Sequence, residues 1–237
     1  KSFLMQKTNF KFEILIHDDA STDRTAEIIK EYELKYPDLI KPILQLENQY
    51  SRGGSVNTIN LINLNRAKGK YIAVCEGDDY WIDPYKLQKQ VDYMEKNPEY
   101  SLCVHGGYIV TAAEKKIQAS NRPYKKNKLF TVEEIIEGGG GLFLTNSMLF
   151  AKKYALERPD FLENAPVGDY SYAINLSLLG KVYYIDELMS AYRVGHSGSW
   201  TAREFNNIEN IKKHYTQIEK MLDDLNGYTD YQYTDVI

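Results

Sequence analysis

The chain has 237 residues, of which 26% are charged and 43% hydrophobic, and its formal net charge is −4. This length suffices for one sizeable α/β domain, and the slight negative charge gives no support to nucleic-acid binding. No apolar stretch approaches the roughly 20 residues that a membrane span needs, and no charged-then-apolar leader opens the sequence. We therefore expect a cytoplasmic protein without a membrane span in this chain.

The first hundred residues alternate between predicted strands and helices. Apolar runs bounded by polar residues predict buried strands, and apolar residues spaced three or four apart predict helices. The predicted order is a strand at residues 12–16, a helix through Ile28 that stops before Pro37, a strand at 39–46, a helix through Ile59 that ends near Gly69, a strand at 71–75 and a helix at 85–97. This alternation predicts a mainly parallel sheet with right-handed crossovers. Pro42 places the second strand at an edge of the sheet.

Helix starts are marked by side chains that can cap free backbone N–H groups. Ser21 or Asp23 is expected to cap the first helix, and Asp83 before Pro84 to cap the third. Aspartate accepts hydrogen bonds from the first amides of a helix, and proline is tolerated at the first helical position.

The second half of the chain is less regular. The predicted elements are one or two strands at residues 101–110, a surface loop at 115–128, a glycine hinge at 138–141, a helix that follows Gly168 and ends at Gly180, a strand at 182–185, a Gly/Ser-rich loop at 192–200 and a last helix from Phe205 to Leu225. Glycine runs lose the most entropy on ordering, so 138–141 and 195–198 are expected to close only over a ligand. Without a repeat or a low-complexity linker, we expect a single domain over residues 1–237.

Two pairs of adjacent aspartates follow predicted strands. Asp18 and Asp19 follow the first strand, and Asp78 and Asp79 follow the third. Taken singly, each pair is also explained by helix capping or by a solvated turn. Ligands of open α/β sheets bind at the carboxyl ends of the strands, so both pairs are expected to meet in one crevice. Adjacent carboxylates repel each other, and a divalent ion that holds a diphosphate would relieve this repulsion.

The cysteines and three of the histidines have plainer explanations. Cys75 and Cys103 lie in apolar runs and are expected to be buried and reduced. His17, His105 and His214 have no partner at metal-ligand spacing, and we expect them to be structural or exposed.

Several motifs together resemble those of family 2 glycosyltransferases. Residues 18–25, DDASTDRT, are similar to the DDGSTD segment of that family, and residues 67–73, AKGKYIA, to its AKGEYI segment. Residues 76–79, EGDD, stand where the family has its Asp-any-Asp motif. Gly168-Asp169 resembles a later Glu-Asp motif with glycine in place of glutamate, and Tyr192-Arg193 followed by His196 resembles the C-terminal loop.

The resemblance implies a GT-A fold, which is a Rossmann-like, mainly parallel sheet flanked by helices, with a less regular acceptor part. Nucleotide-sugar binding would fall in about residues 1–100, and acceptor binding with the C-terminal helix in about residues 101–237. The first strand of the family, which carries part of the nucleotide pocket, is absent from this sequence. We therefore expect the chain to begin inside the first helix of the fold.

The resemblance also implies a role for each matching residue. Carried over by position, Asp19 would bind the base, with Asp18 beside it, and Asp78 would contact the ribose or the sugar. Asp79 would bind Mn²⁺ or Mg²⁺, and His196 would contact the metal or the diphosphate. Asp169 would be the catalytic base. Asp169 is equally placed to be a helix N-cap, and one carboxylate can serve both purposes. Gly168 removes one carboxylate near the acceptor, whereas Asp169 keeps a base available.

The activity implied is that of an inverting, hexosyltransferase-type enzyme of class EC 2.4. Its donor would be a UDP-sugar and its acceptor a hydroxyl of a saccharide or lipid-linked saccharide, in cell-surface polysaccharide biosynthesis at the inner face of the membrane. A sugar-nucleotide-binding module with impaired catalysis is the alternative. A phosphatase or phosphotransfer receiver fits less well, because Asp18-Asp19 lacks Asp-any-Asp spacing and no suitable lysine follows either acidic pair.

Overall fold

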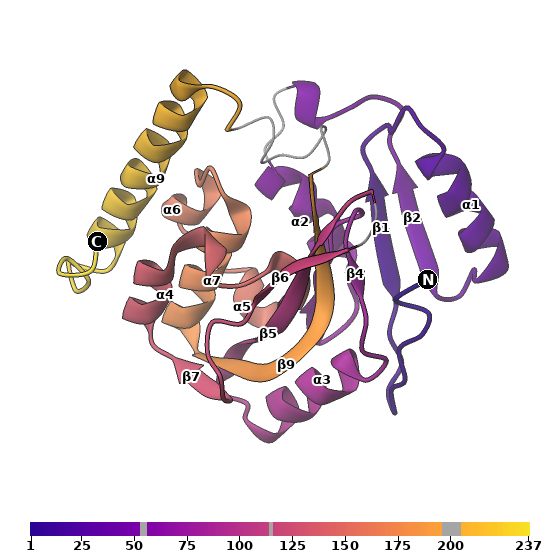
Figure 1. Cartoon of the computed structure of the whole chain (residues 1–237), viewed down its shortest axis with the longest axis horizontal. Coiled ribbons are helices and arrows are strands. Elements are labelled where there is room, and N and C mark those ends of the chain that lie inside the picture. Colours follow the sequence, from indigo (N-terminus) through magenta and orange to yellow (C-terminus); the bar gives the residue numbers. More distant parts are fainter. Residues whose placement is uncertain (53–55, 114–115, 196–204) are drawn as a thin grey trace. The chain divides into compact units, whose positions relative to one another are not determined.

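The computed structural model describes residues 1–52, 56–113, 116–195 and 205–237. These divide into two compact units: a smaller unit of residues 8–72, and a larger unit of residues 1–7 and 73–237. Figure 1 shows their elements along the chain. The expected single domain over residues 1–237, with a donor half and an acceptor half, stays a prediction.

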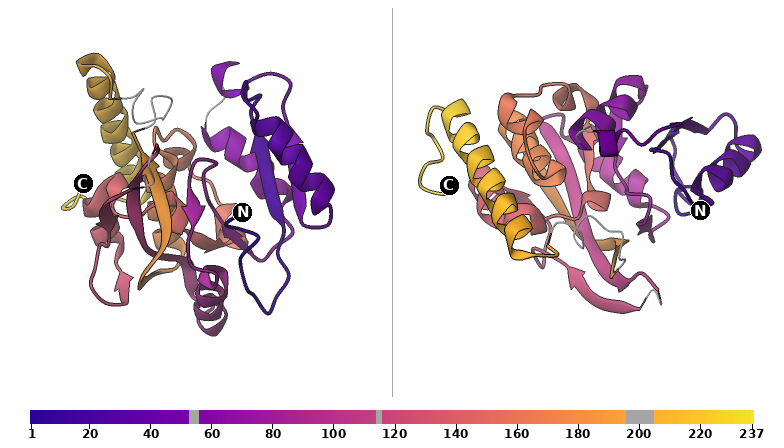
Figure 2. Two further views of the ribbon diagram at one scale, coloured as in Figure 1. Left: turned by 45° about the vertical axis from the view of Figure 1, so that its right-hand side comes forward. Right: turned by 90° about the horizontal axis from the view of Figure 1, so that it is seen from above.

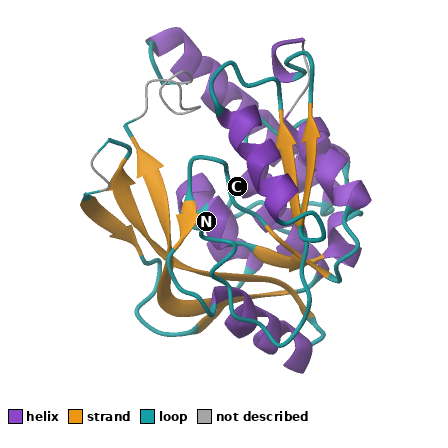
Figure 3. Ribbon diagram, turned by 90° about the vertical axis from the view of Figure 1, so that its right-hand side faces the viewer, coloured by secondary structure: helices purple, strands orange, loops and turns teal. Residues whose placement is uncertain are grey.

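The smaller unit is built on two parallel strands. It contains β1 (Ile14–Asp18), α1 (Thr25–Lys35), β2 (Ile40–Leu44), the 3-10 turn η1 (Tyr50–Arg52) and α2 (Val56–Arg66). Ile14 pairs with Ile40 and Asp18 with Leu44, and Figure 3 shows both strands pointing the same way. Each strand has one neighbour, so the edge position predicted for the strand that contains Pro42 is confirmed.

Arg66 joins α2 to both strands of the smaller unit. Its Nη2 donates to the carbonyl oxygen of Ile16 at 3.1 Å and to that of Lys41 at 2.7 Å. A guanidinium can bridge two strands in this way because it carries five donors in a fixed fork. The last turn of α2 therefore fixes the carboxyl half of β1, which leads to Asp18 and Asp19.

The larger unit has a seven-stranded sheet in which β3, β8, β5, β9 and β4 follow one another, while β6 pairs with β5 and β7 with β9. The strands are β3 (Tyr71–Ala73), where the smaller unit passes into the larger, β4 (Tyr80–Trp81), β5 (Tyr100–Thr111), β6 (Ile117–Asn121), β7 (Lys128–Phe130), β8 (Leu149–Ala151) and β9 (Lys181–Val194). The long strands β5 and β9 are parallel, and Figure 1 shows how strongly β9 curves.

The sheet of the larger unit is mixed, so the expected mainly parallel sheet is wrong. β6 and β8 run antiparallel to β5, and β4 and β7 run antiparallel to β9. The strands before the two aspartate pairs also belong to different sheets, β1 to the two-stranded one and β3 to the seven-stranded one. An apolar run predicts a strand but carries no information about its partner, which is why the sequence did not separate the sheets.

Two loop predictions in the second half were also wrong. The polar stretch 115–128 contains β6 and the start of β7, and residues 192–194 continue β9 instead of starting a loop. Four of the five β6 residues are exposed, so this strand has no apolar alternation to reveal it. Near the N-terminus, residues 2–5 form a turn where a helix was expected.

Helices cover the sheet of the larger unit on several sides. They are α3 (Lys86–Lys96), α4 (Val132–Gly138), α5 (Lys152–Ala155), α6 (Asp160–Glu163), α7 (Gly168–Leu179) and α9 (Ile208–Tyr228), with the 3-10 turns η2 (Gly139–Gly141) and η3 (Thr145–Ser147). The apolar helix α7 packs on β5 and β9 and is itself contacted by α4, α5 and α6. The amphipathic helix α9 packs on α6, and Figure 2 shows α9 in yellow near the C-terminus.

The core of the larger unit lies around β5 and β9. Leu102, Cys103 and Val104 of β5 and Tyr184 and Met189 of β9 are completely buried. Cys103 is thus a buried free thiol, whereas the free thiol Cys75 is half-buried. In the part of the chain that the structure describes, no helix combines the length and the apolar character needed to cross a membrane.

The helix starts differ slightly from the predicted caps. The N-cap of α1 is Arg24 and that of α3 is Tyr85, and neither makes a side-chain cap. Asp23 Oδ1 accepts instead from the amide of Thr25 at 2.9 Å, and Asp83 Oδ1 from that of Tyr85 at 2.7 Å. Aspartate readily binds the amide two residues on, so each aspartate orders the turn just before its helix.

Candidate functional site

The acidic segment 76–79 lies between β3 and β4, where Asp79 is buried and Asp78 is exposed. Asp79 Oδ1 accepts from the backbone N–H of Arg193 in β9 at 2.9 Å, and Oδ2 accepts from Nδ2 of Asn146 at 2.6 Å. The Arg193 side chain also donates from Nε to the carbonyl oxygen of Asp78. Both oxygens of Asp79 are therefore oriented by hydrogen bonds, with further lone pairs still able to accept.

The turn η3 connects Asp79 with the predicted base, Asp169. Its second residue, Asn146, donates to Asp79, and its first residue, Thr145, donates from Oγ1 to Asp169 Oδ2 at 2.8 Å. Consecutive Cα atoms are about 3.8 Å apart, so two neighbouring residues hold both carboxylates. One turn of the larger unit therefore contacts both Asp169 and Asp79, which adjoins Asp78, while their roles in a common site stay predictions.

Buried side chains hold η3 in place. Trp81 Nε1 donates to the Asn146 carbonyl at 2.9 Å, and Ser190 Oγ to Asn146 Oδ1 at 2.6 Å. Gln90 Nε2 donates at 2.8 Å to the carbonyls of both Ser147 and Cys103. Partners on α3, β4 and β9 thus fix the turn, which matters because buried polar groups are costly unless they are bonded.

The network ends at a completely buried lysine. Lys86 Nζ donates to Gln90 Oε1 at 2.8 Å and lies 4.2 Å from the centroid of the Trp81 ring. Burial lowers the pKa of Lys86 from 10.5 to about 7, because an apolar surrounding disfavours the charged form. The sequence suggested only that α3 has an apolar face. Gln90 lies on that face, three residues after Leu87 and four before Met94, and Lys86 lies four residues before Gln90, so helical spacing was the available signal for both.

Glu76 is a site residue that the sequence analysis left without a role. Its carboxyl pKa is raised from 4.5 to about 7, first by burial and then by the negative charges of Asp79 and Asp169, while a hydrogen bond from its own backbone N–H partly offsets the rise. Among the described residues, its shielded Oε2 has no hydrogen-bond partner. Its position in the EGDD motif was the available signal, because only Gly77 and Asp78 separate it from Asp79.

Asp169 lies in the first turn of α7, where the N-cap is Val167 and not Asp169. Its Oδ1 accepts from the backbone N–H of Tyr170 at 2.7 Å. Burial raises the pKa of Asp169, while the hydrogen bonds from Thr145 and Tyr170 oppose the rise. The carboxylate is therefore more basic than a solvated aspartate and has a fixed direction, as a proton acceptor needs.

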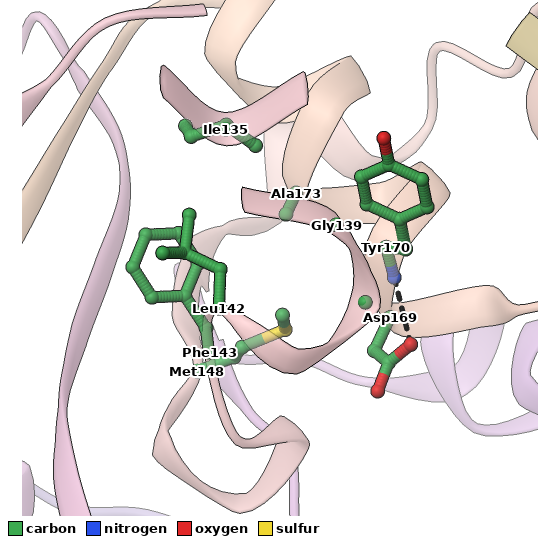
Figure 4. A pocket seen from close by; sticks show the side chains of 9 residues that line it. Ile135, Gly139, Leu142, Phe143, Met148, Asp169, Tyr170 and Ala173 are labelled. Carbon is green, nitrogen blue, oxygen red and sulfur yellow. Dashed lines mark hydrogen bonds between the residues drawn. The ribbon is translucent and has the colours of Figure 1, made fainter. Parts of the chain in front are cut away.

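A small cavity of about 10 Å³ adjoins Asp169, as Figure 4 shows. Apolar side chains including Phe143 and Met148 surround it, and its volume suits about one water molecule. Gly139, in the predicted hinge, lines it with a φ of +63°, a conformation that glycine adopts without strain. Gly138 ends α4 and residues 139–141 form η2, so the expected closure of this run over a donor stays a prediction.

A divalent cation fits the chemistry of the acidic segment. Burial and the nearby Asp78 charge raise the pKa of Asp79 to about 6 against the opposing hydrogen bonds from Arg193 and Asn146, and Glu76 is perturbed in the same sense. Carboxylate oxygens are the ligands that Mg²⁺ and Mn²⁺ prefer, and Mg²⁺ commonly takes only one or two from the protein. The described residues form no cluster of three metal-binding side chains. The expected ligand His196 and the loop 196–198 lie outside the described residues.

Asp18 and Asp19 belong to the smaller unit. Asp18, buried at the end of β1, accepts from the Ser21 amide at 3.3 Å and from the Ser21 hydroxyl. Asp19 accepts from the amide of Gln49 at 2.8 Å through Oδ1 and from that of Tyr50 at 3.0 Å through Oδ2. Asp19 therefore ties the end of β1 to the loop after β2, and its remaining lone pairs can accept from a ligand.

Ala20 stands where the DDGSTD segment has glycine, and it has a φ of +58°. This left-handed conformation costs a residue with a Cβ roughly 1 kcal/mol. The bonds of Asp18 to Ser21 and of Asp19 to Gln49 hold the turn in this strained form, and such strain is often found at ligand-binding turns.

Comparison with known proteins gives consistent matches. Residues 1–158 match the family model described as glycosyl transferase family 2. The chain is 33% identical over 198 residues to an uncharacterised protein of Mycobacterium tuberculosis, covering 84% of this chain and 54% of that protein. It is 28% identical over 197 residues to an uncharacterised glycosyltransferase of Nostoc sp., covering 81% and 58%.

A shorter match is to an Escherichia coli protein named UDP-Glc:alpha-D-GlcNAc-diphosphoundecaprenol beta-1,3-glucosyltransferase. It is 38% identical over 93 residues, which cover 38% of this chain and 33% of that protein. The chain spans about half the length of the mycobacterial relative, 54%.

Proposed function

This chain belongs to glycosyl transferase family 2, and on that basis we propose that it transfers a sugar, with inversion, from a UDP-sugar to a hydroxyl acceptor. The observation that carries the proposal is the turn η3, which holds Asp79 through Asn146 and Asp169 through Thr145. Neighbouring residues of one turn thereby contact Asp79, which we propose binds the metal on the diphosphate, and Asp169, which we propose accepts the acceptor proton. That pairing is what a single-displacement glycosyl transfer needs.

The family implies the GT-A fold, and we propose that the two units together form it as a single domain. The parallel pair β1–β2 with its helices would supply the base-binding part, with Asp19 on the base and Asp18 beside it. The acidic segment 76–79 would supply the ribose or sugar contact through Asp78. The hydrogen bonds of Asp19 to two loop amides support this role, because they fix its direction.

A divalent cation, Mn²⁺ or Mg²⁺, would be held by Asp79 together with Glu76, and His196 is proposed to help. Such an ion neutralises the charge that develops on a leaving diphosphate. Arg193 adds a cation beside Asp78. The raised pKa values of Glu76 and Asp79 support this assignment, because they mark negative charge that the protein itself leaves uncompensated.

Asp169 would act on the acceptor. It would take the proton from the acceptor hydroxyl as that oxygen forms a bond to the anomeric carbon. The bond from this carbon to the diphosphate oxygen breaks on the opposite face, and the configuration inverts. No covalent intermediate with the protein is needed, and Thr145 and the Tyr170 amide keep the carboxylate aimed throughout.

The acceptor is proposed to be a saccharide or lipid-linked saccharide in cell-surface polysaccharide biosynthesis, with the reaction in the cytoplasm at the inner face of the membrane. The E. coli relative is named for a UDP-Glc donor and a diphosphoundecaprenol-linked acceptor, which supports this class. A catalytically impaired sugar-nucleotide-binding module is the second candidate, because Gly168 replaces the glutamate of the family motif.

Calorimetry of UDP binding with and without Mn²⁺ tests the donor site. We expect Mn²⁺ to tighten UDP binding to the wild type, and the Asp79→Asn variant to lose most of this gain, because the amide is a poorer metal ligand. Asp19→Ala should weaken UDP binding with or without metal, since its proposed contact is to the base. Asp92→Asn, on the exposed face of α3, is the matched control. Unchanged affinity and unchanged metal dependence in Asp79→Asn would refute its role.

Hydrolysis of UDP-sugars, followed with and without Mn²⁺, separates the two candidate functions. A glycosyltransferase commonly hydrolyses its donor slowly when water takes the place of the acceptor. A wild-type chain that binds UDP but neither hydrolyses nor transfers from any UDP-sugar would be the binding module instead.

A further inference from the structure

A groove between α6 and α9 lies on residues that the proposed reaction does not use. Its volume of about 650 Å³ is within the range of small-molecule binding sites. Four residues at α6 line it, Pro159, Asp160, Phe161 and Asn164, and three on α9, Lys220, Asp224 and Tyr228. The two helices pack against each other within the larger unit, so the groove has walls on both sides.

The groove has an aromatic surface. Phe161 is buried, and its ring centroid lies 5.4 Å from that of Tyr228 at an interplanar angle of 52°. Tyr228 is 55% exposed, so much of its ring remains available to a ligand. A tyrosine ring supported from behind offers a rigid apolar surface with a polar tip, which suits the C–H face of a sugar ring.

Hydrogen-bonding groups surround this aromatic surface. Asp160, Asn164, Lys220 and Asp224 are all exposed. Carboxylates accept, the lysine ammonium donates and the asparagine amide does both, although Asn164 Nδ2 already donates to the Asp160 carbonyl at 3.1 Å. Neighbouring hydroxyls of a sugar donate and accept in the same way, so the groove complements their pattern.

We propose that this groove binds an oligosaccharide of neutral or amino sugars. Two aspartates against one lysine give the groove a net negative charge, which disfavours phosphorylated or other acidic ligands. If the proposed function holds, the occupant is a sugar part of the acceptor that lies away from the reacting hydroxyl and carries no phosphate. Asn164 and Asp169 are five residues apart, so their Cα atoms are at most about 18 Å apart, a span that a short oligosaccharide covers.

Saccharide binding in the absence of donor tests the groove directly. The probes are a glycan array and, in solution, cellotetraose, maltotetraose and chitotetraose, with binding followed by ligand-observed NMR. We expect neutral or amino-sugar glycans to bind in preference to acidic ones. Tyr228→Ala should weaken binding at least about tenfold, because the stacking surface is lost, and Tyr228→Phe should retain most of it.

Matched controls lie on the same helix. Tyr215→Ala and Asp223→Asn replace exposed residues of α9 that do not line the groove, and they should bind like the wild type, whereas Asp224→Asn should bind several-fold more weakly. Circular dichroism checks that each variant keeps its helices. Asp224→Asn and Lys220→Gln change only exposed side chains, so they test the groove even if Tyr228→Ala loosens α9.

The results separate this proposal from the proposed function. Wild-type binding of UDP–Mn²⁺ without binding of any glycan would refute the groove and leave the glycosyltransferase assignment standing. Glycan binding that every groove variant retains would also refute it, as would a preference for acidic glycans. The opposite result is also distinguishable. If the wild type bound no UDP, and glycan binding were lost in Tyr228→Ala but kept in Tyr215→Ala, the groove would be supported and the donor site refuted.

Discussion

At the scale of single residues, Asp169 and Glu76 show how similar carboxylates acquire different properties. Asp169 receives hydrogen bonds from Thr145 and from the Tyr170 amide, whereas the shielded Oε2 of Glu76 has no partner among the described residues. The pKa of Glu76 reaches about 7 because burial adds to the charges of Asp79 and Asp169. These environments are consistent with the roles proposed above, Asp169 as a proton acceptor and Glu76 as a neighbour of a cation.

The Asp169→Asn variant tests the assignment of the catalytic base. Loss of a general base costs on the order of 10²–10⁴ in rate, so we expect turnover with a saccharide acceptor to fall by this factor. UDP-sugar affinity should stay unchanged, because a base acts on the acceptor proton. The side-chain amide can still accept from the Tyr170 N–H through its oxygen and can donate to the Thr145 hydroxyl through its nitrogen, so stability should change little.

Two measurements decide between roles for Asp169: product formation for transfer and calorimetry for donor binding. Asp223→Asn, an exposed aspartate of α9, is the control with the same chemical change. Transfer at the wild-type rate would exclude Asp169 as the base. Loss of donor binding with the fold intact would place Asp169 in the donor site instead.

At the scale of elements, the three-residue turn η3 has the greatest influence on the site. It touches Asp169 through Thr145, Asp79 through Asn146 and Gln90 through the Ser147 carbonyl. Buried partners from α3, β4 and β9 leave the turn little freedom. A short segment can therefore set the separation of two carboxylates that are 90 residues apart in the sequence, as their numbers, 79 and 169, show.

Replacing Asn146 with alanine should disturb the proposed metal site more than the fold. Asp79 Oδ2 would lose a donor at 2.6 Å, and losing a residue that orients a metal ligand typically costs 10–100-fold in metal affinity. We expect the Mn²⁺-dependent part of UDP binding to weaken at least about tenfold in Asn146→Ala. Calorimetry over a Mn²⁺ titration measures it.

Ser147→Ala is the control for Asn146→Ala. It removes the bond from Ser147 Oγ to the Leu144 carbonyl, 2.6 Å long, in the same turn but leaves Asp79 untouched. Both variants should lose about 1–3 kcal/mol of unfolding free energy, while only Asn146→Ala should lose metal dependence. Equal loss of metal dependence in both would mean that the turn acts only through stability.

At the scale of the whole molecule, buried ionisable groups should govern how stability depends on pH. The folded chain releases the Lys86 proton near pH 7, whereas an unfolded lysine holds its proton up to its usual pKa of 10.5. Between these values the unfolded chain binds more protons, so the free energy of unfolding rises with pH. Burial raises the pKa of Cys103 from 9.0 to about 12, and it raises that of Cys75 as well. Above pH 9 the folded chain therefore keeps cysteine protons that the unfolded chain loses, and this contribution lowers the free energy of unfolding as the pH rises.

Urea denaturation at pH 7, 8 and 9 measures the contribution of Lys86. We expect the wild type to gain roughly 1–2 kcal/mol over this window from Lys86 alone, and Lys86→Met to lose this gain. Lys96→Met, an exposed lysine at the end of α3, should keep it. If the wild type and Lys86→Met showed the same dependence on pH, Lys86 would be charged in the folded chain.

Much of the local structure followed from the sequence. The strands β1, β2 and β3 and the helices α1, α2 and α3 were predicted within a few positions, because their apolar pattern is strong and Pro37 and Gly69 mark clear limits, whereas the two-residue strand β4 was missed. The polar strand β6 and the extension of β9 beyond Ile185 were missed, since both depend on pairing with β5 and not on local pattern. The expected single parallel sheet failed for the same reason.

For the candidate site, the sequence by itself determined the acidic motifs and the family, because these depend on residue type and spacing along the chain. It named Asp78, Asp79 and Asp169 but not Thr145 and Asn146, which join two of them, nor the buried Lys86 and Gln90 behind them. Only the tertiary structure decided these partners, because the hydrogen bonds link residues up to 115 positions apart. The physical reason is that a buried polar group takes whatever partner the packed strands bring within reach, and no local pattern records that choice.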